Sequence, residues 1–291
     1  MPIDSPRDEN QYVLGAESGA ETARLVELDR LVSRSMGGLF PDDLDLASIH
    51  TILDIACGPG EWVCNVAFEH PEIDVTGIDL SRSSIQYARA RAQVQRLDNV
   101  SFRTMDATKS LDFPDGSFDF VNARFLVGFM SPTDWPRLLQ ECMRIMRPGG
   151  VLRLTEAEGW GMTSSTALDA IHEMGLRAMR LARRSFFQAG PYVGIVPMLA
   201  RFLRDTGYRN IKQRAYLIDW SAGTRDYQGW TQNIKVAAYL LQPFVIQMGL
   251  TTAEAFEKLY QQALEEMASA DFSATLFFSS AWGEAVSQAQ G

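Results

Sequence analysis

The chain has 291 residues, of which 46% are hydrophobic and 22% are charged, and its formal net charge is −9. This composition predicts a packed core and excludes an extensively disordered chain. The acidic balance argues against a nucleic-acid partner, because contacts to phosphates need a basic face.

The cysteines and the hydropathy of the chain indicate neither a disulfide-rich secreted protein nor a membrane protein. The three cysteines, Cys57, Cys64 and Cys142, suggest neither a disulfide framework nor a paired-cysteine metal site, so we expect no metal. The first residues are polar and lack the apolar segment of a secretory signal. No apolar run approaches the roughly 18 residues that span a bilayer, and we therefore expect a cytoplasmic protein.

The first 45 residues are predicted to form an arm followed by a helix. Residues 1–11 are polar, and apolar positions recur at helical spacing from Ala20 to Met36, until Gly37-Gly38 ends the pattern. This helix can pack on its own core or exchange onto a neighbouring copy, which would make a homo-oligomer.

Residues 46–158 alternate predicted strands with predicted helices. Strands are expected at TILDIAC (51–57), DVTGIDL (74–80), SFRTMD (101–106), FDFVNAR (118–124) and VLRLTEAE (151–158). Ser81 is predicted to cap the helix after the second strand, and RPGG (147–150) to stop the helix before the fifth. The alternation predicts an α/β fold with a parallel sheet that is covered on both faces and has right-handed crossovers.

The second half is predicted to combine insertions with the rest of the core. Residues 159–196 are expected to be a helical cap insert, 197–220 to return to the core, 221–270 to form cap helices, and 271–291 to give the last strand and a tail. Within the cap, Thr251 and Glu254 have the spacing of a capping box. The aromatic-rich stretch 221–250 does not distinguish helix from strand.

The loop LDIACGPGEW (53–62) is the first functional signal. It follows a strand and opens a helix, a place where loop N–H groups bind ligands at the edge of a parallel sheet. It is not a P-loop, and it lacks the third glycine of the dinucleotide fingerprint, which disfavours a pyrophosphate. Asp79 ends the second strand, where a carboxylate can accept from both ribose hydroxyls, and Asp106 ends the third, where it can accept from a base amine.

This set of motifs resembles the class I methyltransferases that use S-adenosylmethionine. The resemblance covers about residues 50–158, through LDIACGPGEW, GIDLS, MDAT, FPDGSFDFVNARFLVGF and LLQECMRIMRPGGVLRLTE. It implies a Rossmann-like, mostly parallel seven-stranded sheet whose last strand is antiparallel. It points to the small-molecule branch, which acts on natural products or quinones, and implies S-adenosylmethionine as cofactor and S-adenosylhomocysteine as product.

The resemblance also implies residue roles. Ala56, Gly58 and Gly60 would let the loop, with Asp54, approach the methionine part of the cofactor. Asp79 would bind the ribose and Leu80 would flank the adenine, whose amine and ring nitrogen would meet Asp106 and the Ala107 N–H. The Arg124 carbonyl would accept from the cofactor ammonium, with Phe125 on the pocket side. Tyr12 would fold over the cofactor.

Three residues are candidates for the catalytic step. A base is needed only if the nucleophile loses a proton as it attacks. His172 follows the fifth strand and could be that base, or it could be an ordinary polar residue of a helix. Glu156 and Tyr12 are the other candidates, with Glu158 a further polar contact. His50 and His70 are expected at the surface.

The aromatic side chains of 159–196 and 221–250 predict a hydrophobic acceptor, since small-molecule sites are mostly apolar. The methylated atom could be O, N or C. Three alternatives stay open: a terpenoid or prenyl C-methyltransferase with coupled cyclisation, in which aromatic rings would stabilise a carbocation; a nucleic-acid or protein methyltransferase; and a protein that binds the cofactor without transferring methyl.

Overall fold

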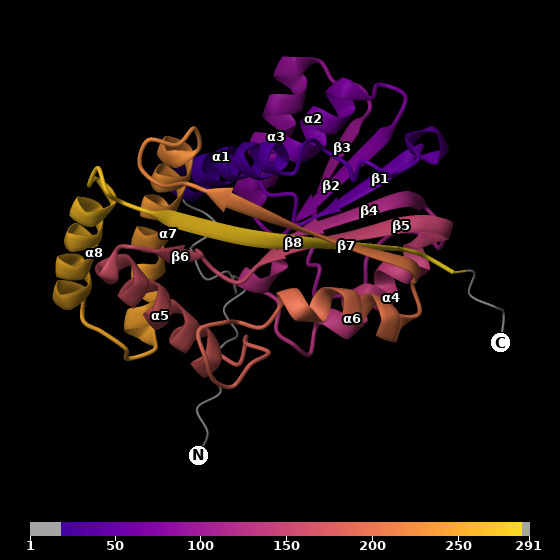
Figure 1. The fold of residues 1–291 in the computed structure, drawn as a ribbon. Coiled ribbons are helices and arrows are strands. Elements are labelled where there is room, and N and C mark those ends of the chain that lie inside the picture. Colours follow the sequence, from indigo (N-terminus) through magenta and orange to yellow (C-terminus); the bar gives the residue numbers. More distant parts are fainter. Residues whose placement is uncertain (1–18, 287–291) are drawn as a thin grey trace.

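The structure is a computed structural model that describes residues 19–286 and contains an eight-stranded sheet flanked by helices (Figure 1). The strands are β1 (Thr51–Ile55), β2 (Asp74–Asp79), β3 (Val100–Thr104), β4 (Phe118–Arg124), β5 (Met146–Ala157), β6 (Met162–Thr163), β7 (Arg209–Asp219) and β8 (Ala274–Glu284). The α-helices are α1 (Gly19–Ser35), α2 (Glu61–Glu69), α3 (Arg82–Gln95), α4 (Trp135–Ile145), α5 (Thr166–Leu181), α6 (Leu199–Thr206), α7 (Tyr227–Gln247) and α8 (Ala253–Met267). Short 3-10 turns occupy Leu46–Ser48, Leu126–Gly128 and Val196–Met198.

The strand order is β3-β2-β1-β4-β5-β8, with β7 on the free side of β8 and the two-residue β6 extending the β5 side. Strands β1 to β5 are parallel, and β8 is antiparallel to both β5 and β7. The predicted mostly parallel sheet with an antiparallel last strand is therefore confirmed. The short β6 is the one strand beyond the expected seven.

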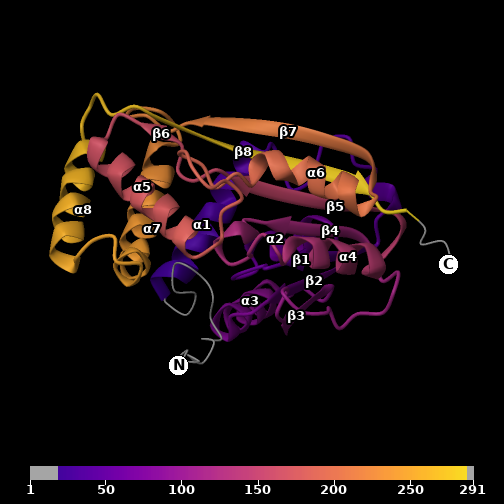
Figure 2. The same cartoon turned by 90° about the horizontal axis from the view of Figure 1, so that it is seen from below.

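Helices cover the sheet on both faces (Figures 1 and 2). Apolar residues of α2 and α3 pack on one face around Trp62, and those of α4 and α6 pack on the other around Trp135. Three further helices, α5, α7 and α8, stand beyond the carboxyl ends of the parallel strands as a cap with its own apolar core. Helix α1 joins the two parts, because it packs against α7 of the cap and α2 of the core.

Several local predictions hold and others are corrected. Ser81 caps α3 as expected, since its hydroxyl accepts from the Ser84 N–H. The cap of α8 is Thr252, whose hydroxyl accepts from the Ala255 N–H, so the predicted Thr251 box is displaced by one residue. The RPGG segment follows the end of α4 as expected, but it also belongs to β5, which begins at Met146 and therefore earlier than predicted.

The first cap insert, 159–196, contains less helix than its sequence predicts, and the stretch 221–250 contains more. Within 159–196 only Thr166–Leu181 is α-helical. Ser165 sets the start of this helix, since its hydroxyl accepts from the Leu168 N–H. The ambiguous stretch 221–250 is mostly the single helix α7, which accommodates Pro243 near its end. None of the helices in residues 19–286 is long and apolar enough to cross a membrane.

Candidate active site

A cavity of about 1120 Å³ opens at the carboxyl ends of β1 and β4, where the strand order reverses direction. Ligands of open α/β sheets bind at this switch point. Its walls come from α1, the β1–α2 loop, the ends of β2 to β5, and the cap helices α5 and α7. The residues that line this cavity form a polar half and an apolar half.

The polar half is organised by Asp79 at the end of β2. One carboxylate oxygen accepts from the Gly58 N–H at 2.8 Å, and the other accepts from the Ser81 N–H at 2.8 Å. The loop reaches this position through left-handed backbone at Ala56 (φ +56°) and Gly58 (φ +52°). The structure thus brings together Ala56, Gly58 and Asp79, which lie on two strand ends, as predicted.

Gly60 has a different role from the one expected. It does not line the cavity, whereas its neighbours Gly58 and Pro59 do. A Cβ at Gly60 would lie 2.8 Å from the Ala88 Cβ and 2.9 Å from the Phe102 ring, and its φ is +74°. Gly60 therefore lets α2 start close to α3 and β3.

The third strand end completes the polar half. Asp106 accepts from the Thr108 N–H at 2.9 Å and lies 3.2 Å from the Lys109 ammonium. Burial opposes ionisation, but these hydrogen bonds prevail and lower the pKa of Asp106. Ala107 is buried at the cavity wall, and Leu80 lies there with its side chain partly exposed. The predicted set from β2 and β3 is therefore assembled around one cavity.

Arg124 and Phe125 lie at the end of β4 and line the cavity as predicted. The expectation for Arg124 concerned its backbone carbonyl. Its guanidinium has a separate role: it pairs with Asp29 of α1 at 2.5 Å and lies over the Trp62 ring at 5.6 Å. Asp29 and Arg124 are both largely buried. This ion pair, which the sequence did not predict, attaches α1 to the sheet beside the cavity.

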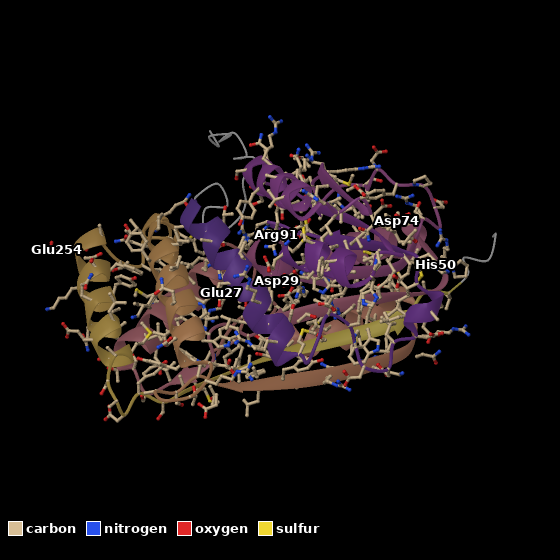
Figure 3. All side chains as sticks on the ribbon, turned by 90° about the horizontal axis from the view of Figure 1, so that it is seen from above. Glu27, Asp29, His50, Asp74, Arg91 and Glu254 are labelled. Atoms are coloured by element: carbon tan, nitrogen blue, oxygen red, sulfur yellow. The ribbon has the colours of Figure 1, made fainter. Side chains whose placement is uncertain are left out.

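A second ionic contact holds the same helix. Arg30 pairs at 3.0 Å with the buried Glu61, which also pairs with Arg91 of α3. Asp29, Glu27 and Arg91 lie close together where α1 crosses α2 and α3, whereas His50 and Asp74 lie at the opposite end of the sheet (Figure 3). Since Leu25, Leu28 and Asp29 line the cavity, α1 is one of its walls.

Asp54 belongs to a buried network that sequence reasoning missed. Its carboxylate accepts from the Asn122 side-chain amide at 2.6 Å, and the Asn122 oxygen accepts from Arg153 at 2.8 Å. Arg153 is fully buried and lies over the Trp62 and Phe120 rings. Burial raises the pKa of Asp54 to about 7, despite the nearby Arg124 and the Asn122 hydrogen bond.

This shift predicts a pH dependence of stability. A raised pKa in the folded state means that the Asp54 contribution is full below pH 3.8 and is lost as pH rises through about 7. Between pH 5 and 8 the wild type should lose about 2 kcal/mol of unfolding free energy more than Asp54→Asn. Urea unfolding of both proteins at both pH values measures the difference. Equal slopes for the two would refute the shifted pKa.

The apolar half, which we call the apolar chamber, lies between the sheet and the cap. It is lined chiefly by Phe125, Trp160, His172, Leu176, Trp230 and Phe278. His172 is half-buried in its wall: the ring stacks on the Trp160 indole at 5.5 Å, and Nε2 accepts from the Trp160 backbone N–H at 3.4 Å. Burial lowers the pKa of His172 to about 4, so the imidazole is neutral at pH 7.

Glu156 and Glu158 instead fix backbone loops. Glu156 is buried outside the cavity lining and accepts from the Leu126 N–H at 2.6 Å. Glu158 accepts from the N–H groups of Gly194 and Val196, both at 2.7 Å. The catalytic role considered for Glu156 is therefore corrected to a structural one.

The other candidate side chains are placed as follows. Tyr12 lies outside the described residues. His50 is exposed as predicted, while His70 is partly covered and lies 3.4 Å from Glu72. Cys57 is buried in the loop and burial raises the pKa of its thiol, which fits a packing role and disfavours a reactive thiolate.

Comparison with known proteins agrees with this architecture. Residues 52–150 match the family described as a methyltransferase domain. The match begins in β1 and ends in β5, so it spans the strand ends that form the polar half. Residues 52–150 are therefore similar to a methyltransferase domain, and they form the part of the parallel sheet that borders the cavity.

Two curated relatives and one solved structure illustrate the similarity. The chain is 36% identical over 102 residues to the demethylmenaquinone methyltransferase of Listeria welshimeri, a match that covers 35% of this chain and 42% of that protein. It is 28% identical to the 27-O-demethylrifamycin SV methyltransferase of Amycolatopsis mediterranei over 88% of this chain and 79% of that one. The YcgJ protein of Bacillus subtilis shares the fold, with a TM-score of 0.51 and 17% identity over 81% of this chain and 92% of its own.

Proposed function

We propose that this protein transfers the methyl group of S-adenosylmethionine to a hydrophobic small molecule. The observation that carries the proposal is the convergence of Gly58, Asp79 and Asp106, from three successive strand ends, on one cavity at the switch point. Bound there, the cofactor supplies an electrophilic methyl group on a sulfonium.

The polar half fits an adenosyl group with a short zwitterionic tail. Asp79 accepts from the N–H groups of Gly58 and Ser81, so its carboxylate is held at the edge of the cavity, where a carboxylate can bind the two hydroxyls of a ribose. Asp106 and the Ala107 backbone lie where an adenine edge can be recognised, with Leu80 beside it. The left-handed turn at Gly58 would let the backbone approach the tail, and the Arg124 carbonyl and Asp54 would be acceptors for its ammonium.

The apolar chamber is the proposed seat of the acceptor. It adjoins the polar half within the same cavity, so a ligand there can meet a methyl group presented from the sheet side. The chain's contribution is alignment and exclusion of water, since a sulfonium methyl needs no further activation. The volume of about 1120 Å³ is above the usual range for one drug-sized ligand, which suits two.

The core and the cap would bind different ligands. The core (residues 46–158, 197–220 and 271–291) would hold the methyl donor, and the cap (159–196 and 221–270) would enclose the acceptor. The acceptors in the relatives' names, a demethylated menaquinone and a rifamycin, support a natural product or quinone over nucleic acid. The three unpaired cysteines favour a reducing compartment such as the cytoplasm. A homo-oligomer through α1 remains an alternative.

The test is binding and turnover by the purified chain. Calorimetry should show one S-adenosylhomocysteine per chain, and incubation with labelled S-adenosylmethionine and a panel of hydrophobic hydroxyaromatics should label one of them. A chain that binds neither form of the cofactor would contradict the proposal. Binding without transfer across the panel would favour the non-transferring alternative, and a labelled terpenoid would favour the C-methylating one.

A further inference from the structure

We propose that His172 is a hydrogen-bond donor to an oxygen anion of the acceptor, through Nδ1, and that the acceptor is a hydroxyaromatic compound that enters the apolar chamber already ionised. This rests on the proposed function, because it places the acceptor beside the methyl donor. It differs from the general-base role considered above, since the histidine gives a hydrogen bond and takes no proton.

The orientation of the ring is fixed from three sides. A Cβ on Gly159 would lie 2.0 Å from Nε2, so only glycine allows this close approach of backbone to ring. The Trp160 N–H points at Nε2 at 3.4 Å, and the Trp160 indole stacks on the imidazole with an interplanar angle of 21°. The ring is therefore held in place before any acceptor arrives.

This arrangement determines which nitrogen carries the proton. In a neutral imidazole one nitrogen donates and the other accepts. Nε2 accepts from Trp160, so the proton is on Nδ1. Among residues 19–286, no group hydrogen-bonds Nδ1, and that atom is not one of the fully buried polar atoms that lack a partner. Nδ1 is thus a donor that remains accessible on a side chain lining the cavity.

The surroundings make proton acceptance by this ring unfavourable. The side chains that line the apolar chamber with His172 are aromatic and aliphatic, and burial alone lowers the pKa of His172 to about 4. No carboxylate contributes to that shift, so an imidazolium would have no counter-charge. An acceptor that must lose a proton to the protein would find no suitable base here, whereas an ionised oxygen finds a donor.

The chemistry then balances without a base. An oxygen lone pair of the ionised acceptor forms a bond to the methyl carbon, the carbon–sulfur bond breaks, and its electron pair stays on sulfur. A phenolate and a sulfonium give a neutral ether and a neutral thioether, and no proton is released. The negative charge of the acceptor is also complementary to the positive sulfonium before reaction.

Ligand binding tests the proposal without relying on turnover. The probes are 2-hydroxy-1,4-naphthoquinone, which is ionised at neutral pH, and 1,4-naphthoquinone, which lacks the hydroxyl. Calorimetry of the complex with S-adenosylhomocysteine should show the ionised probe binding about 10-fold more tightly, a difference of about 1.4 kcal/mol. Equal affinities for the two probes in the wild type would overturn the proposal.

Three variants separate a donor from a base. The amide of His172→Asn can place an N–H near the position of Nδ1, whereas that of His172→Gln lies nearer Nε2 and His172→Phe offers no donor. We expect His172→Asn to keep the preference within about threefold and the other two to lose it. A His172→Asn protein that behaves like His172→Phe would contradict the donor role.

The outcomes distinguish the two proposals. S-adenosylhomocysteine binding is measured first for each protein and checks that the variant folds. If the wild type does not bind it, the proposed function fails. If the wild type binds it but does not discriminate between the probes, only the role of His172 and the ionised acceptor fails.

Discussion

Replacement of Asp79 by alanine is expected to weaken S-adenosylhomocysteine binding by about 100-fold, which corresponds to about 3 kcal/mol. The loss has two sources. Two charge-assisted hydrogen bonds to the ribose would disappear, and the Gly58 and Ser81 N–H groups would lose the carboxylate that orders the loop. Asp79→Asn should show a smaller loss, because its amide keeps one acceptor oxygen.

Asp74 provides the matched control for this experiment. It begins the same strand that Asp79 ends, is exposed, and lies at the end of the sheet away from the cavity (Figure 3). Asp74→Ala should bind S-adenosylhomocysteine within about twofold of the wild type, since exposed changes away from a site have small effects. If Asp79→Ala also binds within a few-fold, the ribose assignment is wrong.

Replacement of Asp29 by alanine is expected to lower the free energy of unfolding by about 3 kcal/mol, because it leaves the buried Arg124 charge without its partner. The two side chains are 13% and 9% exposed and lie 2.5 Å apart. The same change should expose α1 to protease, since this pair attaches the helix to the sheet. Urea unfolding and limited proteolysis measure the two effects.

Glu27 is the matched control on the same helix. It pairs with Arg30 at 3.8 Å, and both side chains are about half exposed, at 42% and 54%. Surface pairs contribute about 0.5 kcal/mol or less, so Glu27→Ala should be nearly neutral. Asp29→Ala with Arg124→Met should recover part of the loss, because the uncompensated charge is removed. Equal destabilisation by Asp29→Ala and Glu27→Ala would show that the buried pair is not what holds α1.

The core was predictable because its signals are local and repeated. The strand patterns alternate with helix patterns, and the topology rule places the carboxyl ends of such parallel strands at one edge of the sheet. Asp79 and Asp106 could therefore be assigned to one site from the sequence. Both side chains line the cavity at that edge.

The features that the sequence did not reveal depend on contacts between distant residues. Asp29 and Arg124 are 95 positions apart, and nothing in either segment identifies the partner. Arg153 is fully buried in a strand, although arginine usually indicates a surface position. The packing of Gly60 against Ala88 and Phe102 could not be read from the loop, because both partners come from other elements.

The place of β8 in the sheet has a consequence for how the protein is made. During synthesis β7 leaves the ribosome well before β8, yet its partner in the sheet is β8, which lies between it and β5. Until about residue 284 has emerged, β7 has no neighbour, and the exposed side of β5 is a free edge open to wrong pairing. The β1–β5 half can assemble early around the loop that starts at Ala56. Closure of the sheet, and with it the wall of the chamber that Phe278 supplies, waits for the last strand.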